Sequence, residues 1–256
     1  MDVDTTRFET RLAQGADDIL AAQRLRYRVF VQELGGGGPG VDHARGIETD
    51  DFDSHCEHLL LIDREADGRP VVGVYRLLDR ERAAGAGRFY SEAEYDLDCL
   101  KRSGRRLLEL GRSCLDRDYR GGAGMMHLWL ALSDLVIRRD IGLLFGVASF
   151  HGTDICRLAE PLSQLHHGHL APEDIRPRSR VHQRMDLVPP DRINRARAMR
   201  AVPPLIKAYL RLGGFIGDGA FVDHSFNTTD VCLVLDTARM NERQRALYAR
   251  GPRGPG

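Results

Sequence analysis

The sequence predicts an α/β fold in which a central mixed sheet is flanked by helices. Three features that follow one another along the chain carry this prediction. Residues 107–115 are an apolar run typical of a buried strand, the glycine-containing loop 118–124 follows, and 125–139 is a strongly apolar helix. Gly142 ends that helix, and 143–150 is apolar enough to form the next strand. The order strand, glycine loop, buried helix, strand is that of a βαβ crossover in an α/β sheet.

The segment before this crossover predicts a helix and a hairpin. Apolar residues recur at helical spacing over about 16–33, which indicates a helix. The glycine-rich run 35–40 ends it in a loop. Two apolar runs at 58–62 and 71–78 indicate paired strands, because Asp67-Gly68 between them is a hairpin turn signal.

The segment after the crossover predicts two more helices and two more strands. We expect these elements at 154–167, 203–212, 215–222 and 231–235. No repeat or linker interrupts the series. We therefore expect a single domain at 16–240, with an N-terminal extension at 1–15 and a disordered C-terminal tail at 241–256.

The charge of the chain is balanced overall but not along its length. Thirty-seven basic residues balance 37 acidic ones, which argues against a nucleic-acid-binding protein. Residues 1–100 hold 12 basic and 21 acidic side chains, whereas 101–256 hold 25 and 16. The arginine-rich segment 176–200 belongs to the cationic half. We expect it either to dock an acidic carrier protein or an anionic membrane surface, or to be a solvated face.

The remaining composition indicates a cytoplasmic protein without a metal. No apolar run approaches the roughly 20 residues of a membrane span, and the acidic N-terminus does not resemble a secretory signal. Five scattered cysteines show no C-x-x-C pair, so neither a zinc site nor a disulfide framework is expected. His166, His167 and His169 lack the spacing of a metal-binding helix.

The glycine loop is the first candidate site. Its residues are Arg120, Gly121, Gly122, Ala123 and Gly124. A strand before it and a helix after it direct backbone N–H groups toward one point, which suits a phosphate, although a tight turn without a ligand has the same pattern. The loop resembles the acyl-donor loop of the GNAT acyltransferase superfamily. Its motif is out of frame, which suggests a donor other than acetyl coenzyme A.

Further motifs make the resemblance more specific. The first set, similar to acyl-homoserine-lactone synthases, is Arg26-x-x-x-Phe30, Glu48-x-Asp50-x-x-Asp53, Gly73-x-x-Arg76-Leu77 and Glu109-x-x-Arg112. The second set resembles the ornithine acyl-carrier-protein N-acyltransferases and comprises the stretches 51–59, 148–154, 203–213, 217–220 and 226–232. Together the two sets extend from about Arg26 to Leu235, which is nearly the whole chain.

This resemblance implies the reaction and its partners. The family transfers a 3-hydroxyacyl chain from acyl carrier protein to the α-amino group of ornithine, which gives lyso-ornithine lipid. The only prosthetic group is the phosphopantetheine of the donor, so no cofactor of the enzyme is expected. The enzyme would act in the cytoplasm, with peripheral contact at the inner face of the membrane as a further expectation.

The resemblance also implies roles for charged residues. Glu109 and Asp53 are the candidate catalytic residues, because an amine must lose a proton to attack a thioester. Glu109 acts either as general base or as the acid that orients the amine. The candidate substrate-binding residues are Arg26, Phe30, Asp50, Arg76 and Arg112, because ornithine carries both a carboxylate and a side-chain ammonium.

Several alternatives remain open for these residues. Arg26 either binds the carboxylate of ornithine or anchors the N-terminal helix. Asp50 and Asp53 either recognise the amine or form a solvated acidic turn, and the whole set could be a buried ion-pair network. The oxyanion is expected to meet a backbone N–H of residues 110–113. Cys114 is a weak nucleophile candidate, because a covalent mechanism needs a histidine within reach.

Other functions remain as alternatives to ornithine acylation. An acyl-homoserine-lactone synthase would use S-adenosylmethionine as the amine, which the motifs at 203–232 argue against. Another amino acid, such as glutamine, lysine or glycine, could replace ornithine after few substitutions. A non-catalytic module that binds acyl chains or carrier protein is the third alternative.

Overall fold

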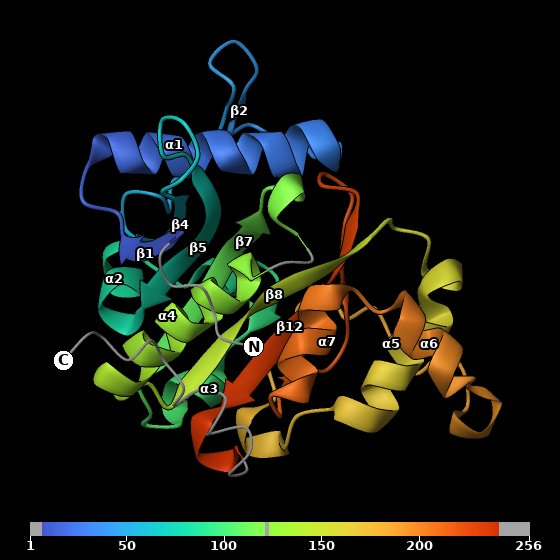
Figure 1. Ribbon diagram of the computed structural model, residues 1–256. Helices are drawn as coiled ribbons and strands as arrows, with labels where there is room; N and C mark the ends of the chain where they lie inside the picture. Colours follow the sequence, from blue (N-terminus) through green and yellow to red (C-terminus); the bar gives the residue numbers. More distant parts are fainter. Residues whose placement is uncertain (1–6, 121–122, 241–256) are drawn as a thin grey trace. The chain divides into compact units, whose positions relative to one another are not determined.

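The computed structural model describes residues 7–120 and 123–240, and these form two compact units. The first unit contains residues 7–86 and 110–140, and the second contains 87–109 and 141–240. Strand β7 (Leu107–Leu115), labelled in Figure 1, belongs to the second unit up to Glu109 and to the first unit from Leu110. The expected C-terminal tail lies outside the described residues.

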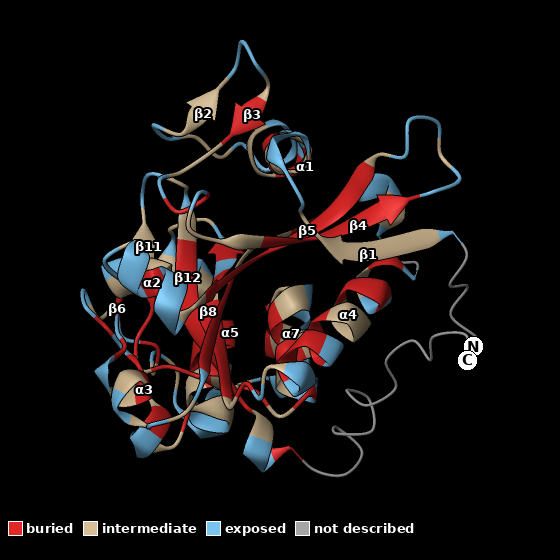
Figure 2. Ribbon diagram, turned by 90° about the vertical axis from the view of Figure 1, so that its left-hand side faces the viewer, coloured by how far each residue is buried: buried red, intermediate tan, exposed pale blue. Residues whose placement is uncertain are grey.

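The first unit contains a separate two-stranded sheet, several helices and one part of the main sheet. Its strands are β1 (Phe8–Leu12), β2 (Val41–Asp42), β3 (Ile47–Glu48), β4 (Glu57–Asp63), β5 (Val71–Asp79) and the second part of β7. Its helices are α1 (Ala16–Arg26), the π-helix η1 (Tyr27–Glu33), α2 (Arg80–Gly85), the 3-10 turn η3 (Arg117–Tyr119) and α4 (Gly124–Arg138). The order in this sheet is β1-β4-β5-β7, with β1–β4 and β4–β5 antiparallel. Figure 2 shows β4 buried along most of its length, whereas the edge strand β1 is only half-buried.

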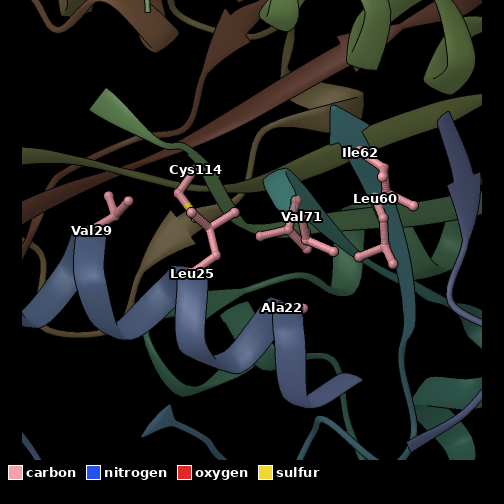
Figure 3. Close-up of a cluster of buried hydrophobic side chains, with 8 residues drawn as sticks. Ala22, Leu25, Val29, Leu60, Ile62, Val71 and Cys114 are labelled. Carbon is pink, nitrogen blue, oxygen red and sulfur yellow. The ribbon is translucent and has the colours of Figure 1, made fainter. Parts of the chain in front are cut away.

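Successive side chains of β4 point alternately to the two faces of this sheet, and one helix covers each face. Leu60 and Ile62 belong to a buried cluster with Leu25 of α1 and Cys114 of β7. Figure 3 shows the Leu25 side chain pointing from α1 toward Cys114. Because successive side chains of a strand point to opposite faces, Leu61 points to the other face.

Helix α4 covers the face to which Leu61 points. A Cβ atom at Gly73 of β5 would lie 2.9 Å from the side chains of Leu115 and Leu128, and 3.2 Å from Leu61. Leu128 belongs to α4, so the missing side chain at Gly73 lets that helix pack close to the sheet. An added methyl group here would overpack this interface.

The second unit combines one parallel strand pair with antiparallel pairs. Its further strands are β6 (Tyr95–Asp96), β8 (Leu143–His151), β9 (Arg178–Ser179), β10 (Phe215–Ile216), β11 (Phe221–Asp223) and β12 (Thr228–Asp236). Its helices are η2 (Tyr90–Ala93), α3 (Asp98–Arg102), α5 (Ile155–His169), η4 (Glu173–Ile175), η5 (Pro190–Arg192), α6 (Arg195–Ala201), α7 (Pro204–Arg211) and η6 (Thr237–Arg239). The first part of β7 runs parallel to β8, with Glu109 opposite Phe145, and β8 runs antiparallel to β12.

The predicted fold class, a mixed sheet flanked by helices, is confirmed, and β7 has the predicted bounds. The predicted helix at 16–33 changes from α1 to a π-helix after Arg26. The prediction of one strand at 215–222 was wrong: β10 and β11 are separate, because Gly219 has φ = 78° and turns the chain between them. Residues 8–12, placed in the expected extension, pair with β4 as strand β1.

Candidate functional site

Arg26 is the centre of a buried ion-pair network in the first unit. It lies at the end of α1 and its side chain is 0% exposed. Its Nε donates to Glu48 at 2.6 Å, while Nη1 and Nη2 donate to the two carboxylate oxygens of Asp53, both at 2.7 Å. Nη2 also donates to the main-chain oxygen of Glu48 at 2.6 Å. The guanidinium therefore ties α1 to the segment that follows β3.

Two further arginines extend this network, which joins three cations and three carboxylates. Arg76 of β5 contacts Asp50 and donates to Asp53 at 3.0 Å. Arg112 of β7 donates to Glu48 at 3.1 Å and to Asp50 at 2.9 Å. The side chains of Asp50 and Arg112 are 20% and 15% exposed, which is more than any other member. These two residues are the members of the network that are most exposed to solvent.

The network holds Asp53 in its ionised form. Burial opposes ionisation of this carboxyl, but the hydrogen bonds and charges of Arg26 and Arg76 outweigh burial, so its pKa lies well below the usual range. Gln23 adds a hydrogen bond to Asp53 at 3.0 Å. His58 contacts the main-chain oxygen of Asp53 at 3.2 Å, and burial lowers the pKa of this histidine. Asp53 is therefore a carboxylate fixed by its neighbours on several sides.

Arg112 has an unusual backbone for a strand residue. Its φ is 48°, in the left-handed region that side-chain-bearing residues rarely adopt. Such conformations cost on the order of 1–3 kcal/mol and cluster at functional sites. The ion pairs of Arg112 with Glu48 and Asp50 help to offset this cost. The distortion lies within 110–113, where the sequence predicts the oxyanion-binding N–H.

Glu109 lies on the other part of β7, in the second unit, and is 3% exposed. Its carboxylate accepts hydrogen bonds from the backbone N–H of Tyr90 at 2.7 Å and of Ser91 at 2.6 Å. The Ser91 hydroxyl also donates to it. N–H and O–H donors need an acceptor, so this arrangement fits the ionised carboxylate.

Phe30 and Cys114 belong to the apolar surroundings of α1. Phe30 is half-buried and packs against the cluster that contains Leu25 and Cys114. Burial raises the pKa of the Cys114 thiol to about 12. A thiol that stays protonated is a poor nucleophile, so the geometry gives no support to a covalent mechanism at Cys114.

The candidate donor loop is only partly described. Arg120 donates to the main-chain oxygen of Leu115 at 3.0 Å and forms a two-pronged ion pair with Glu33 of η1, in which Nη2 lies 2.9 Å from Oε2. Ala123 precedes α4 and Gly124 is its first residue. Gly121 and Gly122 lie outside the described residues. The loop thus joins β7 to the start of α4, as the crossover predicts.

Sequence reasoning missed several partners of these residues. Gln23 and Glu33 lie on a predicted helix, where nothing distinguishes them from other polar surface positions. Tyr90 and Ser91 act mainly through backbone N–H groups, which leave no signature in a sequence. Within 7–120 and 123–240, no group of three or more His, Cys, Asp or Glu residues could hold a metal ion. No helix in those same ranges is both long and apolar enough to cross a bilayer.

Comparison with known proteins identifies the family. Residues 25–130 match the acetyltransferase (GNAT) domain, a span that contains the ion-pair network and the donor loop. The L-ornithine N(alpha)-acyltransferase of Rhodobacter capsulatus is 58% identical over 97% of this chain and 97% of its own length. That of Brucella abortus is 42% identical over 94% of this chain and 88% of its own length.

A solved structure adds a likeness of fold. FeeM, an N-acyl amino acid synthase from uncultured soil microbes, superposes with a TM-score of 0.54 at 11% identity, over 94% of this chain and 98% of its own. With both curated relatives aligned over nearly the full length, the chain belongs to the L-ornithine Nα-acyltransferase family of GNAT-type acyltransferases.

Proposed function

We propose that this enzyme transfers a 3-hydroxyacyl group from acyl carrier protein to the α-amino group of ornithine, giving lyso-ornithine lipid. The observation that carries the proposal is the 58% identity with an L-ornithine N(alpha)-acyltransferase over 97% of both chains. At that identity and coverage, the network and Glu109 fall within the aligned length. The acyl carrier protein, rather than coenzyme A, is the donor that the sequence motifs imply.

The reaction needs the amine to attack the thioester carbonyl directly. The N–C bond forms, the C–S bond breaks, the proton of the amine leaves to a base, and the carrier is released as its thiol. We assign Glu109 to binding and deprotonating the amine, and a backbone N–H of 110–113 to the oxyanion. We assign the ammonium and carboxylate of ornithine to Asp50 and Arg112, the network members most exposed to solvent. Arg26 and Asp53 would hold those two residues in position.

The proposed reaction is tested by incubating the purified enzyme with 3-hydroxyacyl carrier protein and ornithine. We expect N-acylated ornithine and free carrier thiol in equal amounts. Mass spectrometry measures the acylated ornithine, and a thiol reagent measures the free thiol. Glutamine, lysine, glycine and S-adenosylmethionine serve as competing amines. Product from one of these but not from ornithine would overturn the assignment, and a lactone product would identify a homoserine-lactone synthase instead.

The donor is expected to dock on arginines around α6. Arg192, Arg195 and Arg200 are exposed, whereas Arg197 pairs with Glu160 of α5 at 2.7 Å and fixes the helix. An acidic carrier protein complements such a surface, and surface charges act mainly on association.

Reversing Arg195 and Arg200 to Glu is expected to raise the donor KM roughly tenfold at low salt, with the ornithine KM unchanged. The difference should shrink as salt rises, because exposed charges are screened. The matched control is Arg102→Glu, an exposed arginine on α3 in the same unit. If the donor KM responds equally in both variants, α6 is not the docking surface.

The product is an amphiphile with one long acyl chain. We therefore propose that the enzyme works in the cytoplasm and releases its product at the inner face of the membrane. Incubation of enzyme and substrates with lipid vesicles, followed by separation of the vesicles, measures where the product accumulates.

A further inference from the structure

We propose that the turn η2 is a positioning device for Glu109, and that Ser91 is its key residue. This inference rests on the proposed function, in which the Glu109 carboxylate handles the amine. All groups involved belong to the second unit. The turn supplies three donors to one carboxylate: the N–H groups of Tyr90 and Ser91 and the hydroxyl of Ser91. Two donors converge on Oε1 and one on Oε2, which sets the plane and the rotamer of the carboxylate.

The turn is itself held on one side by contacts of Glu92 with Phe89 and Lys101. Glu92 accepts the N–H of Phe89 at 2.8 Å and binds Lys101 of α3 at 2.5 Å. Lys101 is one of only two lysines among the 37 basic residues of the chain. Its compact ammonium also reaches Asp98 at 3.3 Å. The Lys101 ammonium thus joins the turn to the helix that follows it.

Contacts from Arg180 and Phe145 hold the turn on its other side. Arg180, next to β9, donates from its backbone N–H to the Glu94 main-chain oxygen and from Nε to that of Glu92, both at 2.8 Å. The Phe89 ring packs edge-on against Phe145, with 5.1 Å between ring centroids. Phe145 is the residue opposite Glu109 in the β7–β8 pair. The same strand pair therefore places both the carboxylate and the turn that binds it.

Ser91 is suited to a role beyond folding. It is 0% exposed, and both its N–H and its hydroxyl serve the same carboxylate oxygen. The N–H belongs to the backbone and persists in any variant, whereas the hydroxyl can be removed alone. Hydrogen bonds to an ionised group are stronger than neutral ones, so this single donor has a measurable effect on the carboxylate.

The test is Ser91→Ala, measured alone and in combination with Glu109→Gln. We expect kcat to fall about tenfold with little change in either KM, and the acidic limb of the kcat–pH profile to move to higher pH, because the ionised carboxylate loses a donor. In the Glu109→Gln background, the same substitution should change kcat by less than about twofold, because coupled residues are not additive.

The matched control is Ser163→Ala, a buried serine of α5 in the same unit. Its hydroxyl donates to the Met185 oxygen at 2.8 Å and accepts the N–H groups of Leu187 and Val188, both at 2.9 Å. It should lower stability but leave kcat and the pH profile unchanged. Equal losses of kcat from Ser91→Ala with and without Glu109→Gln would overturn the inference.

A second variant keeps the inference testable if Ser91→Ala does not fold. Glu92→Gln loosens the turn from the side of Lys101 and leaves both donors of Ser91 in place. It should lower kcat in the parent enzyme but change kcat little in the Glu109→Gln background. Equal losses of kcat in both backgrounds would again overturn the inference. Absence of acylated ornithine with the parent enzyme would instead refute the proposed function, so the two failures are distinct.

Discussion

Replacement of Glu109 by Gln is expected to lower kcat by at least about a hundredfold, within the range for loss of a general acid or base. Glutamine has the same shape but cannot accept a proton or balance an ammonium. Its amide NH₂ cannot accept a hydrogen bond from the turn. If the NH₂ takes the place of Oε2, the N–H of Tyr90 loses its acceptor. Loss of that acceptor costs about 1–3 kcal/mol of stability. Steady-state kinetics on the folded fraction separates the two effects.

A suitable control for this variant is Asp154→Asn at the start of α5. Asp154 also accepts two backbone N–H groups, those of Cys156 at 3.1 Å and Arg157 at 3.3 Å. Asparagine caps helices well, so stability and kcat should both stay close to the parent. A Glu109→Gln enzyme that keeps kcat within about threefold of the parent would remove Glu109 from the chemistry.

The sequence predicts best the strand and the helix that are richest in apolar residues. Strand β7 has the expected bounds, because the apolar residues at both of its ends are buried, although Gly111 to Ser113 in its middle are only half-buried. Helix α4 begins within one residue of its predicted start, directly after the glycine loop. The motif residues Arg26, Asp50, Asp53, Arg76 and Arg112 do come together in one network.

What the sequence could not show is decided by contacts distant along the chain. Helix α6 lies in the arginine-rich segment, where the sequence predicts no helix, because it has few apolar residues and depends on Glu160 of α5. Strand β1 has no apolar alternation strong enough to distinguish it from an extension, and pairing with β4 makes it a strand. The left-handed backbone of Arg112 could not be predicted either, because only a glycine at that position would have indicated a positive φ.

Arg26 shows that helical periodicity alone does not indicate whether a charged residue is buried. On the expected helix it falls between apolar residues, where a charged side chain normally faces solvent. In the structure it is fully buried, because Glu48 and Asp53 come from outside the helix to meet it. Burial of a charge is tolerated only when partners neutralise it, and no local pattern shows those partners.

Replacement of Arg26 by Met is therefore expected to destabilise the protein by about 3–5 kcal/mol, because it leaves two buried carboxylates short of a cation. The side chains of Glu48 and Asp53 are only 5% and 8% exposed. Urea denaturation at neutral pH measures the loss. The matched control is Arg28→Met, two residues later, whose partner Asp116 lies 3.2 Å away on a surface pair. Exposed pairs contribute about 0–1 kcal/mol, so this control should unfold almost like the parent.

The pH dependence of that loss follows from Asp53, whose pKa in the folded protein is depressed. Such a group contributes its stability above the unfolded pKa of about 3.9, and the contribution is lost as pH falls toward the folded value. Without Arg26, fewer positive charges compensate for the burial of the Asp53 carboxylate. Protonation of Asp53 therefore removes part of the destabilisation of the variant. The stability difference between Arg26→Met and the parent should be full at pH 7 and shrink below about pH 5. A difference that stays constant down to pH 3 would mean that the cost comes from lost packing around the Arg26 side chain instead of from uncompensated charge.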